Sequence, residues 1–293
     1  MTTTAQRPDD RPEGGPEGRA DEGQPIPTRP LWTRLLPGAS MSPPLRLLER
    51  NILAWRGMWL IFLSVLLEPI FFLFSIGVGV GALVGDVTHP SGEVVSYRSF
   101  VAAGLLATSA MMGPVFDSTF NFFVKLKYFH IYQATLATPM RPTDVVRGEM
   151  LWSLLRAAAY ATAFLITMAI MGLTESWWAV LCAPVAVLIG YAFAGAGLGA
   201  TTYMRSFIDF DFVNLAIIPM FLFSGTFFPL SQYPEWLQWV IRCTPLYQGV
   251  ALERALVFGD ISPSLLLNVA YLLVMGSVGL WVAGRRLGTL LLP

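Results

Sequence analysis

The sequence predicts an all-α polytopic membrane protein with six transmembrane helices. Of its 293 residues, 55% are hydrophobic and only 13% are charged, whereas a soluble domain carries about 25% charged residues. The chain therefore lacks the polar side chains needed to cover a globule in water. Six apolar segments are also long enough to cross about 30 Å of hydrocarbon at about 1.5 Å per helical residue. The predicted spans are 58–83, 100–124, 151–173, 178–201, 207–228 and 264–285.

The first thirty residues differ in composition from the rest of the chain. Residues 1–30 contain six prolines, four glycines, ten charged residues and no aromatic residue. Such a segment cannot bury enough apolar surface to offset the entropy of ordering, and it has no apolar region typical of a secretory signal peptide. We expect a disordered cytoplasmic tail, with the first span directing membrane insertion.

The stretch PPLRLLERNILAWRGMW precedes the first span and alternates apolar with basic and acidic residues at helical spacing. This pattern predicts an amphipathic helix over 43–57 that lies in the cytoplasmic membrane interface. The alternative is that this helix simply continues the first span into the cytosol.

Basic residues predict the orientation of the domain at 58–286, because Lys and Arg accumulate in cytoplasmic segments. Eleven Lys and Arg residues lie in the segments expected on the cytoplasmic side, and three lie in the segments expected on the outer side. The eleven are Arg34, Arg46, Arg50, Arg56, Lys125, Lys127, Arg141, Arg147, Arg205, Arg285 and Arg286, and the three are Arg98, Arg242 and Arg254. We therefore expect a protein of the inner (plasma) membrane with both termini and residues 125–149 in the cytoplasm.

The connection after the fifth predicted span is too long for a tight turn and too apolar for a free loop. Within it, EWLQWVIRC at 235–243 is a short helix candidate flanked by prolines. Nine residues cannot cross a bilayer. We expect an outer re-entrant helical hairpin over 229–262 whose backbone is satisfied by protein.

Two acidic residues lie well inside predicted spans, away from the span ends. Glu68, followed by Pro69, lies in the middle of the first span, and Asp117 lies about 10 Å from the cytoplasmic end of the second. Unpaired carboxylates at such depth are costly, so both either line a shared cavity or subunit interface or join hydrogen-bond networks between helices. Arg156, the one basic residue away from the ends of the predicted spans, is expected to extend toward the cytoplasmic headgroups.

Two sets of apolar or small residues fall at helical spacing. Met220, Phe223 and Phe227 share one face of the fifth predicted span, where they serve either in packing or as a substrate wall. Gly195 and Gly199 have the small-xxx-small spacing that permits close helix contact.

Several function classes find no support in the residues. Two cysteines and two distant histidines cannot form a metal cluster, and no phosphate-binding loop or catalytic set is present. A formal net charge of zero gives no electrostatic argument for nucleic acid. We expect no enzyme, no cofactor and no metal in this chain.

The stretch ATPMRPTDVVRGEM at 137–150 interrupts the apolar sequence with prolines and charges. The preceding residues, YFHIYQATLATP, predict a short helix, and Thr143 is the expected N-cap of the helix that follows. A short helix held at the inner face by two spans would suit the transmission of force from a soluble partner. The alternative is an ordinary cytoplasmic loop.

Three stretches together resemble the membrane subunit of ABC type 2 exporters, including the nodulation-factor exporter and daunorubicin-resistance permease groups. They are FVAAGLLATSAM, YQATLATPMRPTDVVRGEM and LFSGTFFPLSQYPEWLQWVIRCTPLYQGVALERAL, and the resemblance extends over about residues 45 to 286. The tail at 1–30 is not part of the family pattern.

The resemblance implies a homodimer of six-span subunits, each bound to a separate ABC ATPase that binds ATP. It also implies that 128–146 is the coupling segment that docks on the ATPase. The residues that it assigns to coupling are Tyr132, Thr138, Arg141, Asp144, Arg147 and Glu149. The substrate path would lie between subunits along spans one, two and five, near Glu68, Asp117, Met220, Phe223 and Phe227.

The function predicted from the sequence is therefore export of a small amphipathic molecule, such as a drug, lipid or glycolipid, driven by the partner ATPase. Two alternatives remain at this stage. One is a membrane scaffold or assembly factor without transport, which would not require an ATPase partner. The other is an ion-coupled transporter that uses Glu68 and Asp117 as proton sites.

Overall fold

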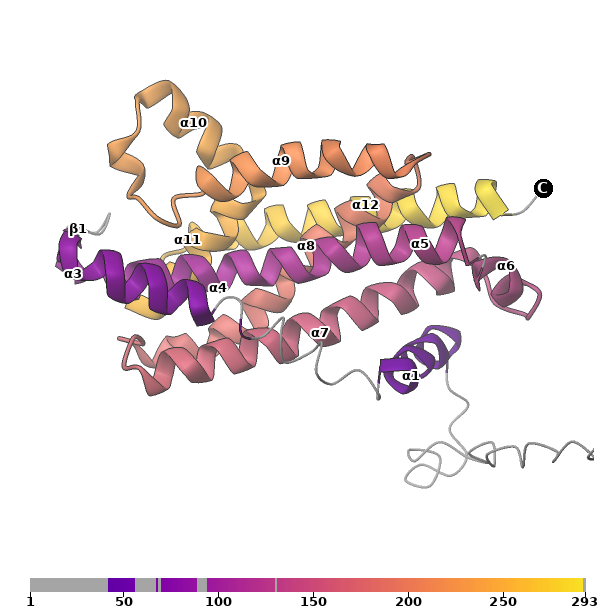
Figure 1. The fold of residues 1–293 in the computed structure, drawn as a ribbon, viewed down its shortest axis with the longest axis horizontal. Coiled ribbons are helices and arrows are strands. Elements are labelled where there is room, and N and C mark those ends of the chain that lie inside the picture. Colours follow the sequence, from indigo (N-terminus) through magenta and orange to yellow (C-terminus); the bar gives the residue numbers. More distant parts are fainter. Residues whose placement is uncertain (1–41, 56–66, 68–69, 89–93, 130, 292–293) are drawn as a thin grey trace, which may run out of the picture. The chain divides into compact units, whose positions relative to one another are not determined.

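The computed structural model describes residues 42–55, 67, 70–88, 94–129 and 131–291. The predictions for the tail at 1–30, for most of the first span and for Glu68 and Pro69 lie outside these residues. The described part is mostly helical, in agreement with an all-α membrane protein (Figure 1).

The elements are as follows in chain order. The first are α1 (Pro43–Trp55), the π-helical segment η2 (Leu73–Val80), α3 (Gly81–Val84), β1 (Asp86–Thr88) and β2 (Val94–Ser96). The next are α4 (Tyr97–Phe116), the π-helical segment η3 (Asp117–Asn121), α5 (Phe122–Lys127), α6 (Ile131–Leu136) and α7 (Pro142–Ile170). Then follow the 3₁₀ segment η4 (Trp177–Leu181), α8 (Cys182–Thr201), η5 (Phe207–Asp209) and α9 (Phe210–Leu222). The last are η6 (Leu230–Gln232), α10 (Glu235–Cys243), α11 (Pro245–Phe258) and α12 (Leu265–Leu291).

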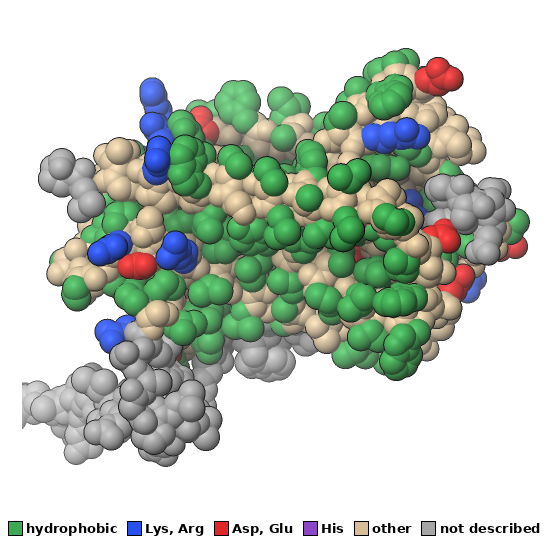
Figure 2. Space-filling view, turned by 180° about the vertical axis from the view of Figure 1, so that it is seen from behind, with side chains coloured by type: hydrophobic (Ala, Val, Ile, Leu, Met, Phe, Trp, Pro, Cys, Tyr) green, Lys and Arg blue, Asp and Glu red, His purple; other side chains and the backbone are tan. Residues whose placement is uncertain are grey.

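Four helices among the described residues are long and apolar enough to cross a membrane. They are Tyr97–Lys127, Pro142–Ile170, Trp177–Thr201 and Leu265–Leu291, which correspond to the second, third, fourth and sixth predicted spans. Figure 1 shows these helices running lengthwise beside one another, and Figure 2 shows the hydrophobic band between the two ends of one face. On that face, most Lys and Arg side chains gather at the left end.

The fifth predicted span is shorter than expected. Residues 207–228 were expected to be helical throughout, but α9 ends at Leu222. Gly225 adopts a φ of 75°, which turns the chain after the helix. The Ser224 and Thr226 hydroxyls lie 2.7 Å apart in this turn, and Thr226 lies against Gly104 of α4. The turn after α9 is thus fastened to the second membrane helix.

A small sheet occurs where the sequence predicted only helices and loops. Strands β1 and β2 pair antiparallel, with Val87 opposite Val95. The pairing lies immediately before α4, whose first turn is capped by the Ser96 side chain accepting the Arg98 backbone N–H at 3.3 Å. The sheet and the cap together fix where the second membrane helix begins.

Helix α8 packs against α4, α7, α11 and α12. Its contact with α12 depends on glycine, because a Cβ on Gly195 would lie within 2.8 Å of the Gly276 Cα atom. One turn later the contact is looser, because a Cβ on Gly199 would lie 3.1 Å from the Gly279 carbonyl oxygen. The predicted packing role of Gly195 and Gly199 is therefore confirmed, with α12 as the partner.

The connection between α9 and α12 contains two helices, α10 and α11. Helix α10 coincides with the predicted EWLQWVIRC helix, and α11 packs against α4, α8 and α12. Arg254 of α11 is buried, donates to the Gly225 carbonyl at 2.8 Å and lies 3.6 Å from the centre of the Phe100 ring. This arginine joins α11 to α4 and to the turn after α9.

Candidate coupling and transport site

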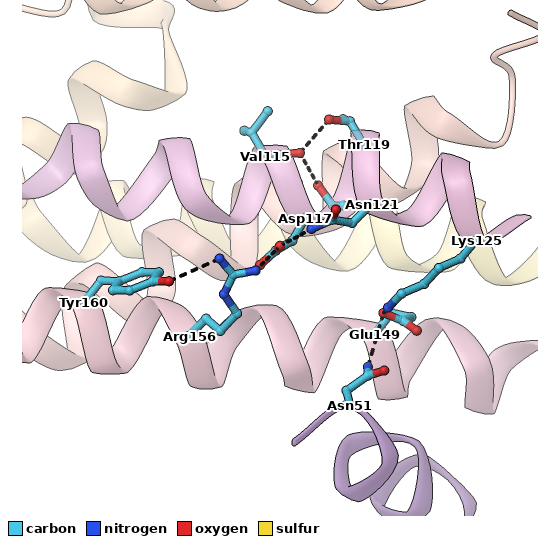
Figure 3. Close-up of polar contacts among 10 residues, drawn as sticks. Asn51, Val115, Asp117, Thr119, Asn121, Lys125, Glu149, Arg156 and Tyr160 are labelled. Carbon is cyan, nitrogen blue, oxygen red and sulfur yellow. Dashed lines mark hydrogen bonds and ion pairs between the residues drawn. The ribbon is translucent and has the colours of Figure 1, made fainter. Parts of the chain in front are cut away.

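Two clusters of polar residues connect the helices on either side of the coupling segment (Figure 3). The first surrounds Glu149, close to the segment itself. The second surrounds Asp117 and Arg156, further along α4 and α7.

Glu149 lies near the N-terminal end of α7 and is 7% exposed. Its carboxylate accepts from the Lys125 Nζ atom of α5 at 2.7 Å and from the Asn51 side chain of α1 at 3.4 Å. The Arg50 guanidinium of α1 lies 3.8 Å from the other carboxylate oxygen. One buried carboxylate therefore links three helices, two of which flank the coupling segment.

The short helix α6 is held by the same cluster. Arg50 donates to the Thr135 hydroxyl of α6 at 3.5 Å. Tyr132 of α6 is fully buried, and its ring centre lies 5.2 Å from that of Phe122. Burial, followed by the negative charge of Glu149 beside it, raises the pKa of the Tyr132 phenol well above its usual value. Tyr132 therefore stays neutral and acts as an apolar anchor for the segment.

The start of α7 differs from the prediction. The expected N-cap was Thr143 and the expected span began at 151, but α7 begins at Pro142 and its N-cap is Arg141. The Arg141 backbone N–H donates to the Asp144 carboxylate at 3.1 Å. A proline at the first helical position has no N–H to leave unsatisfied, and an acidic group in the first turn is stabilised by the helix dipole. The charged residues that suggested a loop thus form the helix start.

The six predicted coupling residues divide into two groups. Tyr132 and Glu149 are buried and Asp144 is half-buried, so these three hold the segment in place. Thr138, Arg141 and Arg147 are exposed. Phe129, which the sequence analysis did not select, is 67% exposed at the start of the segment. We call these four exposed side chains the coupling surface, after the role predicted for the segment: Phe129, Thr138, Arg141 and Arg147.

The second cluster pairs Asp117 of η3 with Arg156 of α7. The Arg156 guanidinium donates to an Asp117 carboxylate oxygen, and both side chains are 5% exposed. The same oxygen accepts from the Asn121 amide at 2.7 Å, and Arg156 also donates to the Tyr160 hydroxyl at 3.2 Å. The expectation that Arg156 extends to the headgroups is therefore wrong, because Arg156 is buried in this pair.

The backbone around Asp117 explains how it reaches Arg156. Pro114 has no backbone N–H and interrupts the hydrogen bonding of α4. The following residues, Asp117–Asn121, form a π-helical turn, which widens the helix and is frequent at functional positions. Of the two readings left open for Asp117, the described contacts favour a hydrogen-bond network between helices.

The apolar residues proposed for the substrate path do not form one stripe. Met220 lies in α9, but Phe223 follows its end and Phe227 lies beyond the turn at Gly225. Phe227 contacts Phe221 edge to face at 5.2 Å, and Phe223 contacts Tyr233 at 6.0 Å. The prediction that all three share one helical face is therefore wrong.

A cavity of about 730 Å³ lies between α9 and the face formed by α4, α8 and α12. Met220, Val115 and Thr119 contribute to its lining, whereas Asp117, Phe223 and Phe227 do not. This volume is within the range of about 300–1,000 Å³ typical of small-molecule sites. Among the residues that the structure describes, no group of three or more His, Cys, Asp or Glu residues is placed to hold a metal ion.

Comparison with known proteins identifies the family of the chain. A family model described as ABC-2 type transporter matches residues 45–258. Nodulation protein J of Rhizobium leguminosarum bv. viciae is 34% identical over 229 residues, which cover 77% of this chain and 86% of that protein. Nodulation protein J of Rhizobium meliloti (strain 1021) is 35% identical over 215 residues, which cover 72% of this chain and 80% of that protein. The chain belongs to the ABC-2 type transporter family.

Proposed function

We propose that the chain is the membrane subunit of an exporter that moves a small amphipathic molecule outward, and that a separate ABC ATPase provides the energy. The observation that carries this proposal is the double polar link between α7 and the helix formed by α4, η3 and α5. Lys125–Glu149 and Asp117–Arg156 join these two helices at two depths. The coupling segment lies between them in sequence.

These links give a mechanical account of coupling. Displacement of α6 by an ATPase is transmitted to α5 and α7, because Tyr132 and the Glu149 cluster hold α6 against both. The Asp117–Arg156 pair keeps the two long helices from sliding past each other further into the membrane. The pair of helices then moves as one body, which is what ATP-driven opening of a substrate path requires.

The partner ATPase is proposed to dock on the coupling surface. Phe129 supplies an exposed aromatic side chain of the kind that dominates protein interfaces, and Arg141 and Arg147 supply positive charge. Asp144 is proposed to stabilise the start of α7, because its carboxylate accepts the Arg141 backbone N–H there. We further propose that the chain forms a homodimer and that only the partner ATPase binds ATP. The complex lies in the inner membrane with both termini in the cytoplasm.

The test is assembly with an ABC ATPase co-expressed with this chain. The double variant Arg141→Glu/Arg147→Glu, and separately Phe129→Ala, should reduce ATPase co-purification and uncouple ATP hydrolysis from transport. The matched control is Arg98→Glu/Arg242→Glu, which reverses two exposed arginines at the other end of the described domain. Unchanged assembly and export in both coupling variants would contradict the docking surface.

Orientation is tested separately with single introduced cysteines at Thr138 and Gln232, both of which are exposed. Cys243 is exposed and must first be replaced by serine, whereas Cys182 is buried. On intact cells, an impermeant thiol reagent should label position 232 and not 138. Labelling at 138 alone would reverse the proposed topology.

An ion-coupled transporter is the competing function, with Glu68 and Asp117 as proton sites. Asp117 accepts hydrogen bonds from both Arg156 and Asn121, which favours a structural role over proton carriage. Export in energised vesicles separates the two functions. Transport that survives removal of ATP but stops when the proton gradient is collapsed would favour the ion-coupled function.

A further inference from the structure

A groove runs along the face of α8 between α9 and α12. The cavity under α9 measures about 730 Å³, and a second hollow of about 720 Å³ lies between α8 and α12. Ala196, Ala200, Tyr203 and Met275 line both, so the two hollows adjoin. Small side chains of α8 form the floor, and the rest of the lining is almost entirely apolar.

One end of this groove carries positive charge. Tyr203 borders both hollows, and the Arg286 guanidinium of α12 lies 4.0 Å from the centre of its ring. Arg205 lines the cavity under α9. Both arginines are exposed.

The acidic residues near this end offset only part of that charge, because Asp209 and Asp211 stand against Arg205, Arg285 and Arg286. Asp209 lines the same cavity, but its carboxylate accepts the backbone N–H groups of Arg205 and Ser206 at 2.6 and 3.1 Å. Asp211 is exposed on α9, and Arg285 adds a further positive charge beside Arg286. An apolar groove that ends at exposed guanidinium groups matches a molecule with hydrocarbon chains and an anionic head.

We propose that this groove binds one anionic phospholipid of the cytoplasmic leaflet. Its acyl chains lie along α8 between α9 and α12, and its phosphate contacts Arg205 and Arg286. The assignment to the cytoplasmic leaflet rests on the orientation given under the proposed function, whereas binding itself does not depend on it. Because the lipid contacts both α9 and α12, it would stabilise α9, whose described side chains are all at least partly exposed.

The test measures lipid retained by the purified full chain by native mass spectrometry, after exchange into phosphatidylglycerol or phosphatidylcholine. We expect the wild type to retain phosphatidylglycerol in preference to phosphatidylcholine. In Arg205→Gln/Arg286→Gln, that preference should fall by about 30-fold, since each basic residue near an anionic surface contributes about fivefold. The matched control Arg46→Gln/Lys127→Gln removes two other exposed basic residues at the same end and should retain the preference.

A second variant tests the groove without changing charge. Ala200 is exposed on the groove floor, so Ala200→Phe should fold while obstructing the acyl chains, and phosphatidylglycerol retention should fall. Equal retention of both lipids by the wild type, or an equal loss in the control pair, would overturn the proposal. Conversion of a dimer to a monomer by Ala200→Phe would identify the groove as a contact between copies, which would also overturn it.

Failure of this proposal is distinguishable from failure of the proposed function. Lipid retention is measured on the isolated chain, and ATPase co-purification is measured on the complex. Loss of lipid preference with normal ATPase assembly in Arg205→Gln/Arg286→Gln would support the lipid site by itself. If the chain prefers phosphatidylglycerol but binds no ATPase, the lipid site is supported and the proposed function is contradicted.

Discussion

The contact between α4 and α7 and the contact between α8 and α12 hold pairs of membrane helices by different means. The first uses charge, with Asp117–Arg156 inside the bundle and Lys125–Glu149 nearer its end. The second uses the absence of side chains, with Gly195 against Gly276 and Gly199 against Gly279. Charged pairs fix which residues face each other, whereas glycine contacts fix how close the backbones lie. The first contact should therefore be sensitive to charge and the second to volume.

The largest effect is expected from adding volume to the glycine contact. In Gly195→Leu, the new Cβ would meet the backbone of Gly276, which cannot rotate away as a flexible side chain would. We expect a loss of more than about 3 kcal/mol and little monodisperse protein in detergent. The control is Gly113→Ala on α4, where the nearest atom to a new Cβ is a Tyr160 ring carbon at 3.9 Å. A stable Gly195→Leu protein would show that the two helices are not in close contact.

The next effect concerns the buried charge pair. Arg156→Met leaves the Asp117 carboxylate buried without its cation, and we expect a loss of about 3–5 kcal/mol in the free energy of unfolding. The double variant Asp117→Leu/Arg156→Met removes both charges and should recover most of that loss. Thermal unfolding in detergent measures all variants of the cycle. If the loss in the double variant equals the sum of the losses in the two single variants, the two charges do not interact.

A smaller effect is expected nearer the end of the same helix pair, at Glu149. Glu149→Gln removes the ion pair with Lys125 while keeping the shape of the side chain, so we expect a loss of about 1–3 kcal/mol. Limited proteolysis should also cut residues 128–141 faster, because α6 loses its support. Glu235→Gln, at an exposed glutamate of α10, is the control and should leave both measurements unchanged.

The smallest effect is expected from Tyr132→Phe. The ring contact with Phe122 remains, so we expect stability within about 1 kcal/mol of the wild type, whereas Tyr132→Ala should lose about 3–5 kcal/mol. The pKa of Tyr132 is raised above its ordinary value of 10.0 by burial. The unfolded phenol therefore ionises first, and wild-type stability should fall as the pH rises above 10.0. Tyr132→Phe should show less of this decline, and an identical decline would exclude Tyr132 as its source.

The sequence predicted the long helices well because their signal is length and apolar composition. Residues 178–201 and the helix at 235–243 agree with η4–α8 and α10 to within a residue or two. The start of α7 was missed because Arg141, Pro142 and Asp144 are typical of both a loop and a helix start. The end of α9 was missed because residues 223–228 are as apolar as the helix, and only Gly225 indicates the turn.

The polar clusters were less predictable, because each depends on which helices become neighbours. Asp117 and Arg156 were both recognised as unusual residues near the cytoplasmic ends of adjacent spans. Their similar depth was an available signal for pairing, since a buried acid and a buried base at one level stabilise each other. The contribution of Asn51 to the Glu149 cluster had no such signal, because it requires α1 to pack against α7.

The glycine contact of α8 also has a consequence for the order of assembly. Helices α4 and α7 are synthesised before α8, so their side of α8 can be covered as soon as it enters the bilayer. The side that bears Gly195 and Gly199 faces α12, and α9, α10 and α11 are all synthesised in between. During biosynthesis the α8 surface at Gly195 and Gly199 therefore stays uncovered by α12 until α9, α10 and α11 have been synthesised. A cell that translates or inserts α12 slowly would accumulate an intermediate whose open surface is this face of α8.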